Sequence, residues 1–234
     1  VFKYFFLFLT LAFPLGRILE RIALNGFSSS LVWIGSFWFA FYLYILLSLL
    51  IIEGVRFTDS FLHLLPQTTH LQYSFVKRAI AFGIVTISAI VIYRGALTAN
   101  RPVINEVTIP IARSQPSLPT LKIAFISDIH MGTIIKNSKL ERMVALVNEQ
   151  EPDLILLGRD IVDEDLGPVI QHNLGETIRN LRAPLGVFGI TGNHEYIGGV
   201  ERAETYLQEH GITMLRDQHV IIKNSIALIG RNDS

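Results

Sequence analysis

The stretch LKIAFISDIH, residues 121–130, passes from an apolar run to two polar residues that can bind a metal, Asp128 and His130. A short apolar run bounded by polar residues is typical of a buried strand. The pattern recurs twice, and a stretch with apolar residues at helical spacing follows each run. The expected strands are residues 121–126, 154–157 and 185–190, and the expected helices are residues 138–150, 169–181 and 201–210. Strands that alternate with helices predict an α/β domain with a sheet flanked by helices.

Two details extend this prediction. Three apolar stretches near the end of the chain are expected to add strands to the sheet: residues 212–215, 220–222 and 226–229. At the start of the first helix, Glu141 follows Ser138 by three positions, so we expect a capping box between their side chains.

The first hundred residues are much richer in Phe, Leu and Ile than the remainder of the chain, which is 50% hydrophobic overall. Residues 31–52 contain no charged side chain. As a helix, about 22 residues at roughly 1.5 Å each would be ~33 Å long, enough to cross a hydrocarbon core of about 30 Å. We therefore expect a transmembrane helix here.

Two more apolar runs, near residues 1–15 and 76–94, predict further spans. The first is also compatible with a signal peptide, although no small-residue cleavage site follows it. Residues 57–65 are expected to form a short interfacial helix. The prediction is a helical membrane region over residues 1–97, in a multi-pass protein of the cell membrane that contacts the lipid bilayer. Basic residues are balanced between the two sides, so its orientation is not predicted.

Residues 98–120 join the two parts of the chain. They are polar and contain four prolines, a composition that disfavours helix and predicts an extended linker. Apolar residues within 103–111 indicate an edge strand, where a bounding proline is tolerated. The domain that follows covers residues 121–234.

Charge and cysteine content exclude several classes of site. The formal net charge is +0, which gives no electrostatic reason to expect a nucleic acid partner. The chain has 0 cysteines, so thiolate ligands, disulfides and cysteine nucleophiles are excluded. Any metal must therefore be held by oxygen and nitrogen atoms.

Polar residues follow each of the three strands, where the carboxyl ends of parallel strands form a common edge. They are Asp128 and His130, then Asp160 and Asp163, then Asn193 and His194. Carboxylates, an imidazole and an amide oxygen suit Mn²⁺, Fe, Zn²⁺ or Mg²⁺, and one carboxylate can bridge two such ions. Singly, each residue is more readily explained as a helix cap, a turn residue or a solvated side chain. Their shared position after three strands favours a site that holds two divalent metal ions.

The blocks Ser127–His130, Gly158–Asp163 and Gly192–Glu195 resemble the D-x-H, G-D-x-x-D and G-N-H-D/E blocks of the calcineurin-like metallophosphoesterases. Apolar spans ahead of the domain resemble the membrane-associated bacterial branch of that superfamily. The resemblance implies the N-terminal part of an α+β metallophosphoesterase sandwich.

The resemblance also implies a role for each residue. Asp128 and His130 would bind the first metal, and Asp160 would bridge to the second metal, which Asn193 would bind. His194 would be catalytic, because it would contact the phosphate and assist the leaving oxygen. The supporting residues would be Asp163 and Glu195.

Two departures from the family pattern stand out. Arg159 occupies the position of the glycine that usually precedes the bridging aspartate, where it would crowd the metals, turn outward or contact a phosphate. No later G-H-x-H block is present, so the domain is expected to be incomplete at its C-terminus. The remaining histidines of this half are interpreted as ordinary surface residues: His172, His210 and His219.

The expected function is therefore a membrane-anchored enzyme that hydrolyses a phosphoester or pyrophosphate bond, with a substrate that is lipid-linked. The lipid-linked substrate is expected only because the protein is expected to be anchored in a membrane. The alternative is a noncatalytic membrane protein that keeps the fold for binding, motivated by Arg159 and the absent histidines. A nucleotide-binding module has little support, because no glycine-rich phosphate loop is present.

Overall fold

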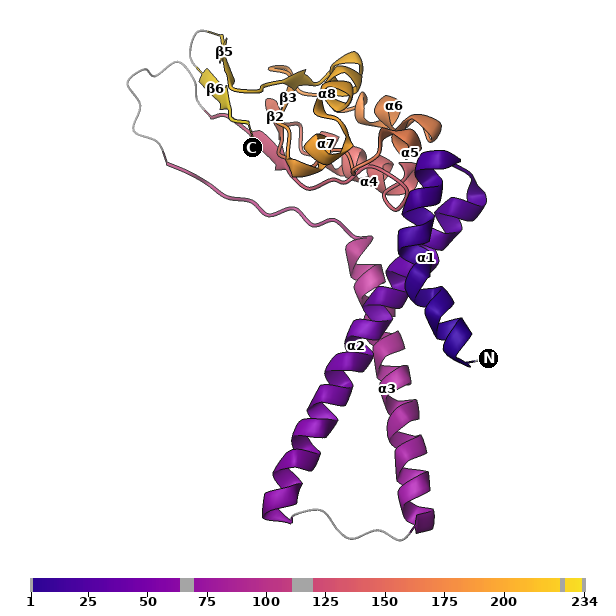
Figure 1. Ribbon diagram of the computed structural model, residues 1–234. Coiled ribbons are helices and arrows are strands. Elements are labelled where there is room, and N and C mark those ends of the chain that lie inside the picture. Colours follow the sequence, from indigo (N-terminus) through magenta and orange to yellow (C-terminus); the bar gives the residue numbers. More distant parts are fainter. Residues whose placement is uncertain (1, 64–69, 111–119, 224–225, 233–234) are drawn as a thin grey trace. The chain divides into compact units, whose positions relative to one another are not determined.

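The computed structural model describes residues 2–63, 70–110, 120–223 and 226–232 (Figure 1). The chain divides into two compact units, Val1–Val103 and Ile104–Ser234. Each unit is described here by itself.

The first unit consists of long helices, which are α1 (Phe2–Ile22), α2 (Gly26–Leu62) and α3 (His70–Ala99). All three are long and apolar enough to cross a membrane, by length and composition, with the candidate span of α3 covering Tyr73–Ala99. Helices therefore occur at each expected span, and all extend beyond the predicted bounds. The side chain of Asn25 begins α2 by accepting hydrogen bonds from the backbone N–H of Phe27 and Ser28.

The separate interfacial helix expected at residues 57–65 is wrong. Residues 57–62 are instead the end of α2, which continues without interruption beyond the uncharged run of residues 31–52. Residues 64 and 65 lie outside the described chain. No proline or glycine pair breaks the helix there, and a Glu53–Arg56 ion pair of 3.2 Å spans one turn of it. The helix ends at His63, which adopts a left-handed conformation with φ of 51°.

Glycines bring α1 and α2 together. A methyl group at Gly16 would lie 2.7 Å from the backbone nitrogen of Val32, and one at Gly35 would lie 2.6 Å from Cα of Phe13. The two backbones can approach this closely only because both positions lack a side chain. The rings of Phe6 and Trp38 then meet edge to face at 5.4 Å.

The second unit is built on a parallel sheet with the strand order β1-β2-β3-β4. The strands are β1 (Ile123–Ile126), β2 (Leu154–Leu157), β3 (Val187–Gly189) and β4 (Thr213–Met214). The helices are α4 (Asn137–Asn148), α5 (Leu166–Gln171), α6 (Leu174–Ile178), α7 (Asn193–Gly198) and α8 (Val200–Glu209). The predicted α/β architecture of this half is confirmed.

The sheet is packed on both faces. Ile155 and Leu157 of β2 belong to a core shared with α4, α6 and α8, whereas Leu154 belongs to a second core with Phe188 and Ile222. Alternate residues of a strand point to opposite faces, so β2 is apolar throughout, as expected of a central parallel strand.

The last two strands do not extend the sheet as expected. Instead β5 (Gln218–Ile222) and β6 (Ile226–Gly230) pair antiparallel with each other as a separate two-stranded sheet. Ile222 and its partly buried neighbours Val220 and Leu228 join the second core. The apolar pattern correctly predicts that these residues form strands. It does not predict their position, because a strand that packs on a face of the sheet and a strand that pairs at its edge bury similar residues.

Two helix predictions are also wrong. Residues 169–181 form α5 and α6 rather than one helix, because Asn173 between them adopts a left-handed conformation with φ of 52°. The capping box of Ser138 and Glu141 is absent, since α4 begins one residue earlier with Lys136 as an N-cap that makes no side-chain hydrogen bond.

The expected edge strand in the linker is not present in the residues that are described. Residues 102–110 have no strand assignment, and Val103 and Val107 are 85% and 79% exposed. Pro102 and Pro110 cannot donate a hydrogen bond to a neighbouring strand. Residue 111 lies outside the described chain.

Candidate metal centre

Backbone hydrogen bonds join the loops that follow β1 and β2. The N–H of Asp128 donates to the carbonyl of Arg159 at 3.0 Å, and the N–H of His130 donates to the carbonyl of Asp160 at 2.9 Å. The N–H of Met131 then donates to the carbonyl of Ile161, also at 2.9 Å. The parallel pairing of the strands thus extends into the loops, so two of the predicted blocks are held side by side.

Three predicted metal ligands have an unusual backbone conformation. The φ angles of Asp128, His130 and Asp160 are 56°, 51° and 56°, in the left-handed region that residues other than glycine rarely adopt. Each such residue costs about 1–3 kcal/mol and persists where the surrounding structure enforces it, often at functional sites. Sequence patterns carry little signal for this strain, although Asp is among the residue types that tolerate it.

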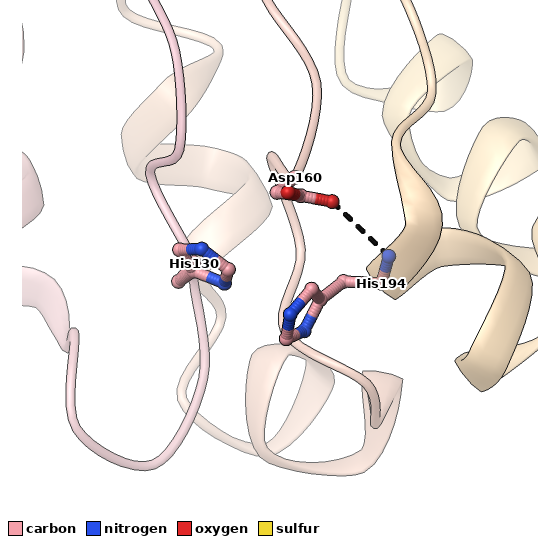
Figure 2. A group of neighbouring side chains, drawn as sticks. All are labelled: His130, Asp160 and His194. Carbon is pink, nitrogen blue, oxygen red and sulfur yellow. Dashed lines mark hydrogen bonds between the residues drawn. The ribbon is translucent and has the colours of Figure 1, made fainter. Parts of the chain in front are cut away.

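His130, Asp160 and His194 converge at the carboxyl edge of the sheet (Figure 2). Their potential ligand atoms all lie within 4.8 Å of one another. The two imidazole rings meet edge to face, with centroids 4.5 Å apart, and Asp160 is only 4% exposed. Oδ1 of Asp160 also accepts a hydrogen bond of 3.1 Å from the backbone N–H of His194. Residues from three loops therefore form one compact group.

Asp163 lies next to both imidazoles. Its Oδ1 is 3.2 Å from Nδ1 of His194 and 4.0 Å from Nδ1 of His130. Nδ1 of His194 is buried and makes no hydrogen bond within the described residues, so the contact with Asp163 is close but not well directed. A carboxylate on the Nδ1 side leaves Nε2 of each ring as the nitrogen for a ligand.

The residues present fit a divalent metal. The donors are imidazole nitrogens and a carboxylate oxygen, a set suited to Zn²⁺, Mn²⁺ or Fe. The carboxylate of Asp160 is buried, and buried charges in proteins are paired or coordinate a metal.

Glu195 connects the loops from inside the protein. Its side chain is 1% exposed, with Oε1 accepting from the N–H of Val162 and Oε2 from that of Gly192, both at 2.7 Å. Burial raises the pKa of this carboxyl and the neighbouring Asp160 raises it further, while the backbone donors lower it. The sequence suggested only a supporting role and did not identify the two amides.

We expect Glu195→Gln to destabilise the protein. A glutamine amide can accept one of the two backbone hydrogen bonds, but its NH₂ group must then face the other N–H donor. Leaving a buried donor unsatisfied costs about 1–3 kcal/mol. Urea unfolding measures the loss, with Glu209→Gln on the exposed surface of α8 as the control. Equal stability of both variants would contradict the bridging role.

Two further residues of the predicted site are exposed. Asp128 is exposed, and it is not a member of the group formed by His130, Asp160 and His194. Asn193 is the exposed first residue of α7, which the sequence analysis did not predict. His210 stacks on Tyr206 at 4.2 Å in a different part of the unit. Of the predicted metal ligands, His130 and Asp160 belong to the compact group.

Comparisons with known proteins agree with this geometry. Residues 121–233 match the family described as calcineurin-like phosphoesterase. A Danio rerio protein named transmembrane protein with metallophosphoesterase domain is 29% identical over 61% of this chain and 32% of its own length. Its Bos taurus namesake is 33% identical over 52% of this chain and 26% of its own length.

A bacterial relative is also similar. The phosphodiesterase YaeI of Escherichia coli is 33% identical over 48% of this chain and 43% of its own length. The chain thus spans less than half the length of these three relatives. No solved structure matches the chain. The match of residues 121–233, together with the three blocks at one edge of the sheet, identifies this part of the chain as a calcineurin-like metallophosphoesterase domain.

Proposed function

We propose that this protein is a membrane-anchored hydrolase that cleaves a phosphoester or pyrophosphate bond with two divalent metal ions. The observation that carries the proposal is the convergence of His130, Asp160 and His194, whose ligand atoms lie within 4.8 Å of one another. Three separate loops supply these residues, and a structural role alone gives no reason for two histidines and a buried carboxylate to meet.

Each residue is assigned a role in this proposal. Asp128 and His130 would hold the first metal, Asp160 would be shared by both metals, and Asn193 would hold the second metal. When bound, a metal pair activates water and neutralises phosphoryl oxygens. His194 contacts the phosphate and supplies the proton that the leaving oxygen takes up. Asp163, 3.2 Å from Nδ1 of His194, orients that ring.

The first unit would serve as the membrane anchor. Three apolar helices of sufficient length support this assignment, and two relatives carry the word transmembrane in their names. A lipid-linked phosphoester is the substrate that anchoring favours. Resistance of the protein to extraction from membranes by alkaline carbonate tests the anchor independently of the chemistry.

The central experiment measures metal content and hydrolysis on the chain purified in detergent. Mn²⁺ is added, bound metal is counted by mass spectrometry, and release of nitrophenol from bis(p-nitrophenyl) phosphate is followed. We expect two metals per chain and hydrolysis that a chelator abolishes. A chain that binds no metal and releases no nitrophenol would overturn the proposal.

Replacement of Asp163 by asparagine should lower kcat more than it changes KM. The asparagine amide is uncharged and cannot hold the imidazole of His194 as a carboxylate does. Loss of such a supporting partner costs about 10- to 100-fold in metal affinity or activity. Steady-state kinetics at saturating Mn²⁺ measures the effect. Unchanged kcat would show that Asp163 does not orient the catalytic ring.

A noncatalytic binding protein is the second candidate. The exposed position of Asp128, outside the compact group, favours it. Such a protein would bind metal without hydrolysing phosphomonoesters or phosphodiesters, and the same purified sample distinguishes the two functions.

A further inference from the structure

Arg159 occupies a position next to the candidate metal centre that the roles above leave unassigned. It directly follows the loop glycine after β2 and precedes the buried Asp160. Its carbonyl accepts the N–H of Asp128, and its side chain is exposed. The backbone of Arg159 is therefore held by a hydrogen bond of the site, while the residue is exposed to solvent.

The side chain of Arg159 leaves the backbone on the side of the third loop. A methyl group built at Gly192 would lie only 2.6 Å from Cβ of Arg159. The next residue after Gly192 is the exposed Asn193. The side chain of Arg159 thus starts close to Gly192, the residue that precedes α7, and next to the buried carboxylate of Asp160.

The negative charges around Arg159 bear on what its guanidinium group can bind. Carboxylates dominate the site, at Asp128, Asp160 and Asp163. A guanidinium is too large to share the compact group with two imidazoles, but it presents a planar fork of N–H donors that matches a phosphate. Arg159 already has an interaction partner in the described fold, so phosphate binding would replace that partner.

We propose that Arg159 binds a second, non-reacting phosphate of the substrate and gives this domain a preference for pyrophosphate-type substrates over simple phosphodiesters. The inference rests on the hydrolase function proposed above and narrows its substrate class. Arg159 is then a specificity residue, and its position in place of a loop glycine is an adaptation of the site.

The test compares Arg159→Ala and Arg159→Lys with wild type, all as the full chain in detergent with Mn²⁺. Arg182→Ala is the matched control, because Arg182 is an exposed arginine in the loop that precedes β3, at the opposite edge of the sheet. Isothermal titration with inorganic pyrophosphate and with inorganic phosphate measures binding directly. Hydrolysis of bis(p-nitrophenyl) phosphate is measured in parallel.

We expect Arg159→Ala to weaken pyrophosphate binding by about 10- to 100-fold, the loss of a charge-assisted contact, with phosphate binding little changed. Arg159→Lys should recover part of the affinity, because it keeps the charge without the fork. Equal losses for both anions, or tighter binding after Arg159→Ala, would overturn the inference. If wild type binds metal and is active but Arg159→Ala binds pyrophosphate normally, this inference alone fails. If wild type binds no metal and is inactive, the proposed function fails as well.

Discussion

Asp160→Asn is expected to remove metal binding and to lower kcat by at least about 10³-fold. The substitution is nearly isosteric, and asparagine tolerates the left-handed backbone that Asp160 adopts at φ of 56°. Its amide oxygen can still accept the hydrogen bond that His194 donates from its backbone at 3.1 Å. What is lost is the negative charge that would hold the metal ions, and charge stabilisation by metals contributes several kcal/mol to such reactions.

A matched control lies at the other end of the same strand. Asp153 directly precedes β2, and its Oδ2 accepts the N–H of Lys122 at 2.8 Å. Asp153→Asn keeps this acceptor and is expected to leave metal content and kcat near wild type. Metal analysis and steady-state kinetics on both variants give the comparison. Full metal occupancy in Asp160→Asn would show that this carboxylate does not bridge.

The sequence predicted the α/β architecture because its strands are short, apolar and bounded by polar residues. Apolar runs such as Leu154–Leu157 become strands in the predicted places, and β1, β2 and β3 pair in parallel. Failures occurred where local pattern does not determine the outcome. Asn173 interrupts a region with good helical spacing, and the hairpin of β5 and β6 packs on a face rather than extending the sheet.

The sequence predicted that side chains from the three loops would meet, but not how they are arranged. Position after three parallel strands indicated that Asp160 and His194 would meet, since parallel strands share one carboxyl edge. The left-handed backbone and the contact of Asp163 with two imidazoles depend on hydrogen bonds between distant loops. Such contacts leave no periodic signal in the chain. The close approach of Gly192 to Asp160 also joins two distant loops, and it likewise leaves no periodic signal.

Gly192→Ala is expected to lower activity by about 10²-fold without altering any predicted ligand. The backbone at Gly192 has φ of −119°, which alanine adopts freely, so no conformational strain is involved. The added methyl group, however, would overlap Oδ1 of Asp160 and lie 2.7 Å from its backbone nitrogen. Asp160 must move, and a displacement of about 1 Å at a catalytic group can cost 10²-fold in rate.

The same overlap predicts a loss of stability of about 1–3 kcal/mol, the usual cost of overpacking a buried contact. Gly83→Ala on α3 is the control, because a methyl group there meets no described atom within 4 Å. Urea unfolding, metal content and kcat are measured on both variants. If Gly192→Ala retains full metal occupancy and activity, the loop after β3 must be able to move away from Asp160. The three loops would then be free to move relative to one another. In that case their contacts could not hold the exposed Asp128 and Asn193 in fixed positions. If the site is rigid, the methyl group added by Gly192→Ala must disrupt it. Gly192→Ala therefore tests directly whether the site is preorganised.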